Sequence, residues 1–134
     1  MALAWHLKRQ NSNEAALAGL ALQEVGVHGA VVPSLWYPEV ANGLLVSERR
    51  LVTSAHAVAA FQADLAQLDI SLDSASPDAT LSSVLSLARL WNLTAYDATY
   101  LELSLRTGLA LATFDAQLAK ALRKAGGRVF GDAR

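Results

Sequence analysis

Residues 94–118 read TAYDATYLELSLRTGLALATFDAQL, and this stretch decides the fold. Thr94 is a good helix N-cap residue, and the segment after it predicts a helix that Gly108 ends. The apolar run 109–113 is then a short strand. A last helix is expected over 115–126. Strand and helix therefore alternate here, as they do along the rest of the chain.

The alternation predicts an α/β protein with a mainly parallel sheet that helices cover on both faces. Sheets of this kind place their functional sites at the carboxyl ends of the strands. The other expected elements are a helical turn or two at 2–7, helices at 11–26, 35–50, 54–68 and 77–92, and strands at 30–34, 69–72 and 128–130.

The composition predicts a single domain over residues 1–134. Hydrophobic residues make up 53% of the chain and charged residues 17%, which suggests strands buried on both faces. Apolar runs stay shorter than the roughly 20 residues of a membrane span, and the N-terminus does not have the pattern of a secretory signal. The absence of cysteine excludes disulfides and thiolate metal sites, so we expect a cytoplasmic protein.

Charge gives no global sign of nucleic-acid binding, because the formal net charge is -1. The basic residues cluster in two places, at Arg49 and Arg50 and at Arg123, Lys124 and Arg128. We interpret both clusters as solvated helix ends, and a local patch for nucleic-acid contact is the alternative. His6, His28 and His56 are far apart in sequence and are expected to be structural or surface residues, and Trp5, Trp36 and Trp91 are expected to pack in the core. Motifs for nucleotide cofactors and for serine hydrolases are absent.

Two acidic residues stand at the predicted helix starts, Asp97 and Asp115. Each has a simple structural explanation, because Asp115 can be an N-cap and Thr94 with Asp97 has the spacing of a capping box. Glu39 is a third candidate, since Asn42 and Gly43 lie on its side of the predicted helix. The apolar stripe of that helix is expected to comprise Val40, Ala41, Leu44 and Leu45.

Carboxylates that converge repel one another unless a cation joins them. Mg²⁺ or Mn²⁺ suits oxygen ligands of this kind, and either ion can activate water for phosphodiester hydrolysis. A solvated surface position remains the alternative for Glu39.

Three segments carry a recognisable pattern: PSLWYPEVANGL at 33–44, LTAYDATYL at 93–101 and LATFDAQL at 111–118, the last followed by a basic helix and Gly126. In order, separation and flanking residues, the chain resembles the PIN-domain family over essentially its whole length, and specifically the VapC-type ribonuclease toxins. The resemblance implies a three-layer α/β/α fold and a Mg²⁺- or Mn²⁺-dependent endoribonuclease.

By position, Glu39, Asp97 and Asp115 match three acids of the family's metal-binding quartet. Thr113 matches the hydroxyl residue that accompanies the last acid. The resemblance further implies an RNA substrate, a homodimer and a VapB-type antitoxin from the same operon that covers the site.

The family's first strand, which carries the first acid, precedes the segment at which this chain begins. Two explanations stay open. Either the start is assigned several residues late, or the chain is a truncated and catalytically impaired module that acts in antitoxin binding or self-association. A phosphoacceptor receiver domain would need a pair of adjacent acids and a lysine that the chain does not have in place.

Overall fold

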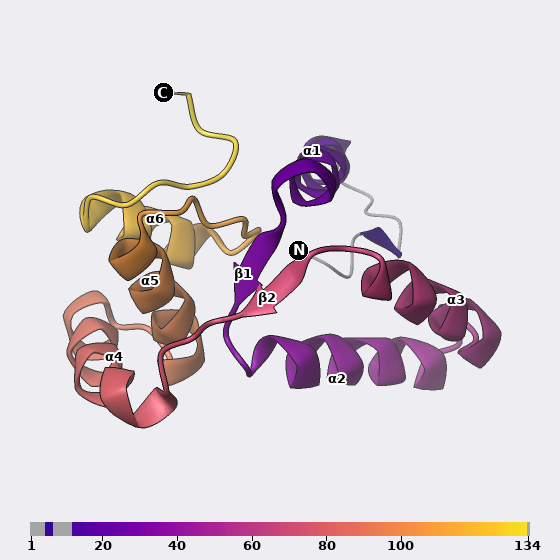
Figure 1. The fold of residues 1–134 in the computed structure, drawn as a ribbon, viewed down its shortest axis with the longest axis horizontal. Helices are drawn as coiled ribbons and strands as arrows, with labels where there is room; N and C mark the ends of the chain where they lie inside the picture. Colours follow the sequence, from indigo (N-terminus) through magenta and orange to yellow (C-terminus); the bar gives the residue numbers. More distant parts are fainter. Residues whose placement is uncertain (1–4, 7–11, 134) are drawn as a thin grey trace. The chain divides into compact units, whose positions relative to one another are not determined.

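The computed structural model describes residues 5–6 and 12–133. It is an α/β structure, mostly helical, with a small parallel sheet of two strands (Figure 1). The chain divides into two compact units, Met1–Ser71 and Leu72–Arg134, which we call the first and second unit. The α/β class predicted from the alternation of strands and helices is confirmed.

The first unit follows the predicted order of elements closely. It comprises α1 (Ser12–His28), β1 (Ala30–Val32), α2 (Trp36–Arg49), α3 (Ala55–Ala66) and β2 (Ile70–Leu72), whose last residue begins the second unit. Ser54 caps α3, because its side-chain oxygen accepts a hydrogen bond from the Ala57 amide at 3.1 Å. Helix α1 continues two residues past Gly26, whereas its predicted cap Asn11 and most of the expected turn at 2–7 lie outside the described residues.

Gly29 joins α1 to β1 in a conformation that other residues rarely adopt. Its φ is +76°, and a Cβ atom at this position would lie 2.8 Å from the backbone oxygen of Asp69. That oxygen accepts a hydrogen bond from the amide of Ala30 at 2.9 Å, so the close approach aligns the two strands. Glycine is therefore required by both the backbone angle and the space.

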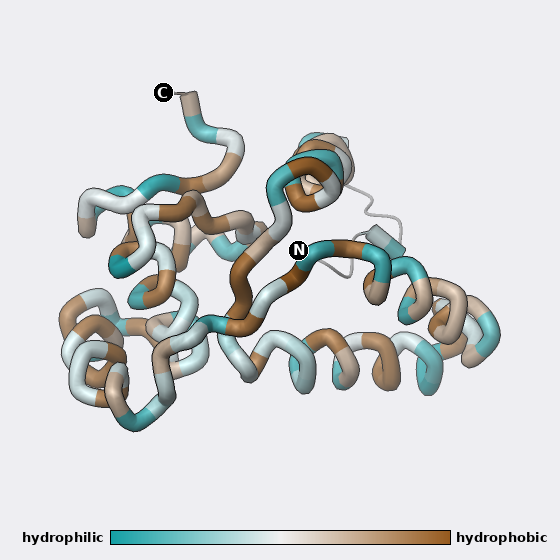
Figure 2. Tube along the Cα trace, viewed as in Figure 1, coloured by the Kyte–Doolittle hydropathy of each residue, from teal (hydrophilic) through white to brown (hydrophobic). Residues whose placement is uncertain are grey.

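The core of the first unit is built between α2 and α3. Val40 and Leu44, one turn apart, pack with Phe61, and Figure 2 shows apolar residues recurring along both helices. The predicted apolar stripe of α2 was too broad, because Ala41 and Leu45 are exposed. The reason is that α3 covers only the narrower face that Val40 and Leu44 share. Trp5 and Trp36 pack against this core, as predicted.

The second unit is a helical assembly made of α4 (Pro77–Trp91), α5 (Ala95–Thr107) and α6 (Ala116–Lys124). Proline opens α4, and the left-handed residues Asn92 and Gly108 end α4 and α5 as the sequence predicts. The core cluster lies between α5, α6 and the C-terminal segment, with Trp91 packed against it, and its buried members are Leu101, Leu118, Ala119, Leu122 and Val129.

Two predicted strands are much shorter than expected. Over 109–113 and 128–130 the structure has a single parallel bridge, Leu111 with Val129, in which the Leu111 amide donates to the Arg128 carbonyl at 3.0 Å. Gly126 and Gly131, both with positive φ, turn the chain just before and after the second segment, so pairing cannot extend. Among residues 5–6 and 12–133, no helix has the length and apolar character needed to cross a membrane.

Candidate functional site

Asp97 lies in the first turn of α5. Thr94 is the N-cap of this helix, and its Oγ1 accepts a hydrogen bond from the Asp97 amide at 3.1 Å. One turn further, Leu101 is fully buried on the same side of the helix, and Asp97 itself is half-buried. The carboxylate therefore stands where the core ends and solvent begins, at the positive end of the helix dipole.

Asp115 is the N-cap of α6. Its Oδ1 accepts a hydrogen bond from the Leu118 amide at 2.8 Å, so the predicted capping role is confirmed. Thr113 Oγ1 accepts a hydrogen bond from the Asp115 amide at 3.1 Å and fixes the backbone just before the helix. Asp115 is exposed, and the cap uses Oδ1 alone. Capping therefore leaves Oδ2 in position to bind another group.

The starts of α5 and α6 lie next to each other. The side-chain amide of Gln117, in the first turn of α6, donates to the carbonyl of Asn92, two residues before the α5 cap, at 3.0 Å. Leu101 and Leu118, each about one turn beyond its acid, belong to the same buried cluster. Two carboxylates and two positive helix ends thus gather at one rim of the second unit.

Glu39 lies in the first unit, whereas Asp97, Thr113 and Asp115 lie in the second. It occupies the first turn of α2 and is exposed, as is Asn42 one turn later. Gly43 beside them is half-buried. Within residues 5–6 and 12–133, no three histidine, cysteine, aspartate or glutamate side chains form a group that could hold a metal ion. Of the three predicted acids, Asp97 and Asp115 therefore lie in the same unit.

A charged cluster that we did not predict lies at the other end of α5. Arg106 binds Glu102 through Nε at 2.7 Å and reaches Asp73, just after β2, through Nη1 at 3.1 Å. The hydrogen bond from Arg106 lowers the pKa of Asp73, and both acids raise the pKa of Arg106. The spacing of Glu102 and Arg106, four residues apart on one helix, could have indicated the first pair; Asp73 has no comparable signal.

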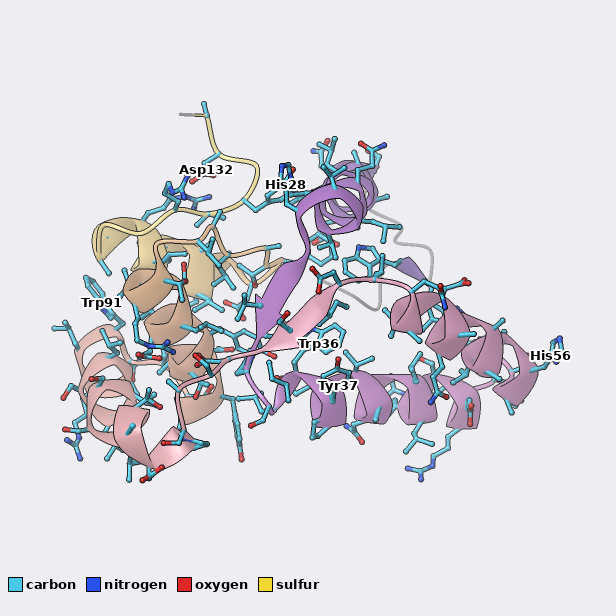
Figure 3. The ribbon with its side chains drawn as sticks, in the orientation of Figure 1. His28, Trp36, Tyr37, His56, Trp91 and Asp132 are labelled. Carbon is cyan, nitrogen blue, oxygen red and sulfur yellow. The ribbon has the colours of Figure 1, made fainter. Side chains whose placement is uncertain are left out.

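The histidines have the structural or surface positions that we predicted. His28 pairs with Glu24 one turn earlier on α1, at 3.1 Å, and is exposed. His56 lies at the start of α3, well away from His28 (Figure 3). His6 Nε2 lies 2.8 Å from Thr53 Oγ1, and its ring lies against Phe61.

The larger basic cluster is engaged within the protein. Arg123 binds Asp132 at 2.7 Å, and Arg128 donates to the Gly108 carbonyl at 2.7 Å.

Comparisons of the chain with protein-family models, with curated proteins and with solved structures found no match. The resemblance to the PIN-domain family stays a prediction.

Proposed function

We propose that the chain is a divalent-metal-dependent endoribonuclease with a PIN-like three-layer fold, the toxin of a toxin–antitoxin pair. The observation that carries this proposal is the placement of Asp97 in the first turn of α5 and of Asp115 at the N-cap of α6, two neighbouring helices of one unit. Their spacing in the sequence, with Thr113 two residues before Asp115, is part of the pattern by which the chain resembles the PIN-domain family.

The donor set suits Mg²⁺ or Mn²⁺. These ions are bound in proteins by one or two carboxylates, with water and substrate phosphate completing the shell, so a pair of aspartates is sufficient. In our proposal Asp97 and Asp115 hold the ion, the latter through Oδ2. The bound ion would supply an activated water and offset charge on the phosphate.

The chain's own residues have separate tasks in this proposal. Thr113 holds the backbone of Asp115, so the carboxylate keeps one orientation while Oδ1 caps α6. Gln117 joins the start of α6 to the loop before α5 and so fixes the spacing between the two acids. The helix starts attract the phosphate of an RNA strand through their dipoles.

A second candidate function is a binding module that acts on an antitoxin or on a second copy of the chain. Large apolar side chains on α4 favour it, since Leu81 is 56% exposed and Leu90 is 69% exposed. The two functions are compatible in a toxin that forms a cytoplasmic homodimer and is silenced by a VapB-type partner. They differ in whether the protein alone cleaves RNA.

Cleavage of total RNA in Mn²⁺ distinguishes the candidates. We expect the wild-type protein to cleave, and Asp97→Asn and Asp115→Asn to lose that activity while staying folded. Asparagine can replace Asp115 as the cap of α6, and the cap of α5 is Thr94, which Asp97→Asn leaves in place. Asp78→Asn is the matched control, since Asp78 is also an acid in the first turn of a helix of the same unit. If the two site variants cleave as fast as Asp78→Asn, the nuclease proposal is wrong and the binding module remains.

A further inference from the structure

We propose that Asp132 is an internal competitor of phosphate: it occupies Arg123 at one end of a face of α6 that binds the phosphate backbone of RNA. This inference rests on the proposed nuclease function and adds to it a binding surface and a contact that limits its use. The surface, which we call the α6 basic face, comprises the exposed cations of that helix, Lys120, Arg123 and Lys124.

The orientation of the α6 basic face is fixed by the core on the opposite side of the helix. The buried positions of α6 are apolar, and Leu122 is fully buried. Apart from the three cations, the exposed residues within the helix are uncharged, so its solvent side carries only positive charge. The helix dipole favours cations in the last turn, where Arg123 and Lys124 lie, but it does not explain Lys120 in the middle of the helix.

The α6 basic face begins at the proposed metal site. Asp115 is the N-cap of α6, and the helical rise places the backbone of Lys120 about 7.5 Å and that of Lys124 about 13.5 Å further along the helix axis. Within the described part of the chain, no carboxylate pairs with either lysine. A strand whose reacting phosphate lies at Asp115 therefore meets cations for its next phosphates along the same helix. Such contacts position a strand without reading its sequence.

Arg123 already holds an oxyanion that belongs to the chain itself. Its Nε donates to Asp132 Oδ2 and its Nη2 donates to Oδ1, both at 2.7 Å, so the guanidinium is presented as a fork to two oxygens. The same fork suits two oxygens of a phosphate. The hydrogen bond from Arg123 lowers the pKa of Asp132, which keeps the carboxylate charged at neutral pH. Asp132, on the segment after α6 (Figure 3), thus stands where a phosphate would bind.

The pair between Arg123 and Asp132 is open to exchange. The two side chains are 51% and 39% exposed, and an exposed ion pair of this kind is weak. A strand that is already held by the two lysines presents its next phosphate to Arg123 at a high effective concentration. Asp132 therefore lowers the affinity of the α6 basic face for RNA without blocking it.

The test is binding of a labelled ten-nucleotide RNA to the full chain in EDTA, measured by fluorescence anisotropy at several salt concentrations. We expect Lys120→Gln to weaken binding about fivefold and to reduce the slope of log affinity against log salt by about 0.7, because one phosphate contact is lost. Arg89→Gln should bind as the wild type does and is the matched control, since Arg89 is an exposed cation on α4 of the same unit. Asp132→Asn should tighten binding about threefold.

Two comparisons show whether Asp132 acts through Arg123. Asp78→Asn removes the same charge from another helix of the unit and should leave the affinity unchanged. In the Arg123→Gln background, Asp132→Asn should give no gain, because the group that it frees is absent. A gain of equal size with and without Arg123, or the same gain in Asp78→Asn, would overturn the role of Asp132 and indicate a general effect of net charge.

The outcomes separate this inference from the proposed function. If Lys120→Gln binds RNA as tightly as Arg89→Gln does, while Asp97→Asn abolishes cleavage in Mn²⁺, the binding role of the α6 basic face is wrong and the nuclease remains. If binding changes as expected but the wild type does not cleave, the face remains an RNA-binding surface and the nuclease proposal is wrong. A wild type that neither binds nor cleaves RNA contradicts both.

Discussion

Replacing Arg106 with alanine removes the cation between Asp73 and Glu102, and we expect it to destabilise the second unit. Arg106 makes two hydrogen bonds to each acid, at distances between 2.5 and 3.1 Å. The Glu102 side chain is 9% exposed and that of Asp73 is 14% exposed, so the variant leaves two poorly hydrated carboxylates without their partner.

The size of the effect follows from this burial. Breaking a fully buried ion pair costs about 3–5 kcal/mol, whereas an exposed pair contributes about 0–1 kcal/mol. The Arg106 side chain is 35% exposed, so solvent screens part of the interaction. We therefore expect the free energy of unfolding to fall by about 2 kcal/mol, which lowers Tm by about 8 °C for a chain of this length.

Urea denaturation followed by circular dichroism measures this change, and a second substitution tests its cause. Glu102→Gln in the Arg106→Ala background removes the buried unpaired charge and should recover about 1 kcal/mol. If Arg106→Ala lowers the free energy of unfolding by less than about 0.5 kcal/mol, the change matches an ordinary surface substitution and the role given to the ion pair is refuted. A double variant no more stable than the single one would refute the role given to the buried charge.

The pH dependence follows from the lowered pKa of Asp73. Arg106 holds that pKa below its ordinary value of 3.8, so the ionised pair stabilises the folded state above pH 3.8. The contribution is lost as the pH falls through the lowered value. Stabilities of the wild type and Arg106→Ala should therefore differ at neutral pH and approach each other in acid.

Three other substitutions test the local structure by urea denaturation. Gly29→Ala should cost about 2 kcal/mol because of its positive φ and the nearby backbone oxygen, whereas Gly26→Ala, in the open part of α1, should be neutral or slightly stabilising. Asp115→Ala should lose about 1 kcal/mol with the α6 cap, and Asp115→Asn should lose almost nothing; equal losses would contradict the capping geometry. Phe61→Ala should cost about 3–4 kcal/mol by opening a cavity in the first unit, and an m-value that stays constant would confirm that the effect is on stability.

Helix starts could be predicted well because their signals are local. Ser54, Thr94 and Asp115 each accept a backbone hydrogen bond from an amide three residues ahead, which depends only on nearby sequence. Strand lengths were predicted poorly, because pairing depends on a distant partner. The segment 109–113 has strand composition, yet it pairs at one residue, since glycines turn the partner segment away on both sides.

The candidate site could be predicted in part, because two of its acids stand at helix starts, whose sequence signals are local. Asp97 and Asp115 were identified from their positions at helix starts, and the structure places those starts side by side. The link that does so, from Gln117 to the Asn92 carbonyl, has no sequence pattern. Glu39 stays a prediction, because its helix belongs to the other unit.

The most direct test of the account is the position of Mn²⁺ on the protein, measured by paramagnetic broadening of backbone amide signals in solution. We expect substoichiometric Mn²⁺ to broaden the signals of residues 96–98 and 114–117 together, and Asp115→Asn to abolish the effect at both helix starts. Broadening at only one of the two starts, or equal broadening at the exposed first turn of α4, would contradict the proposal that Asp97 and Asp115 share one ion.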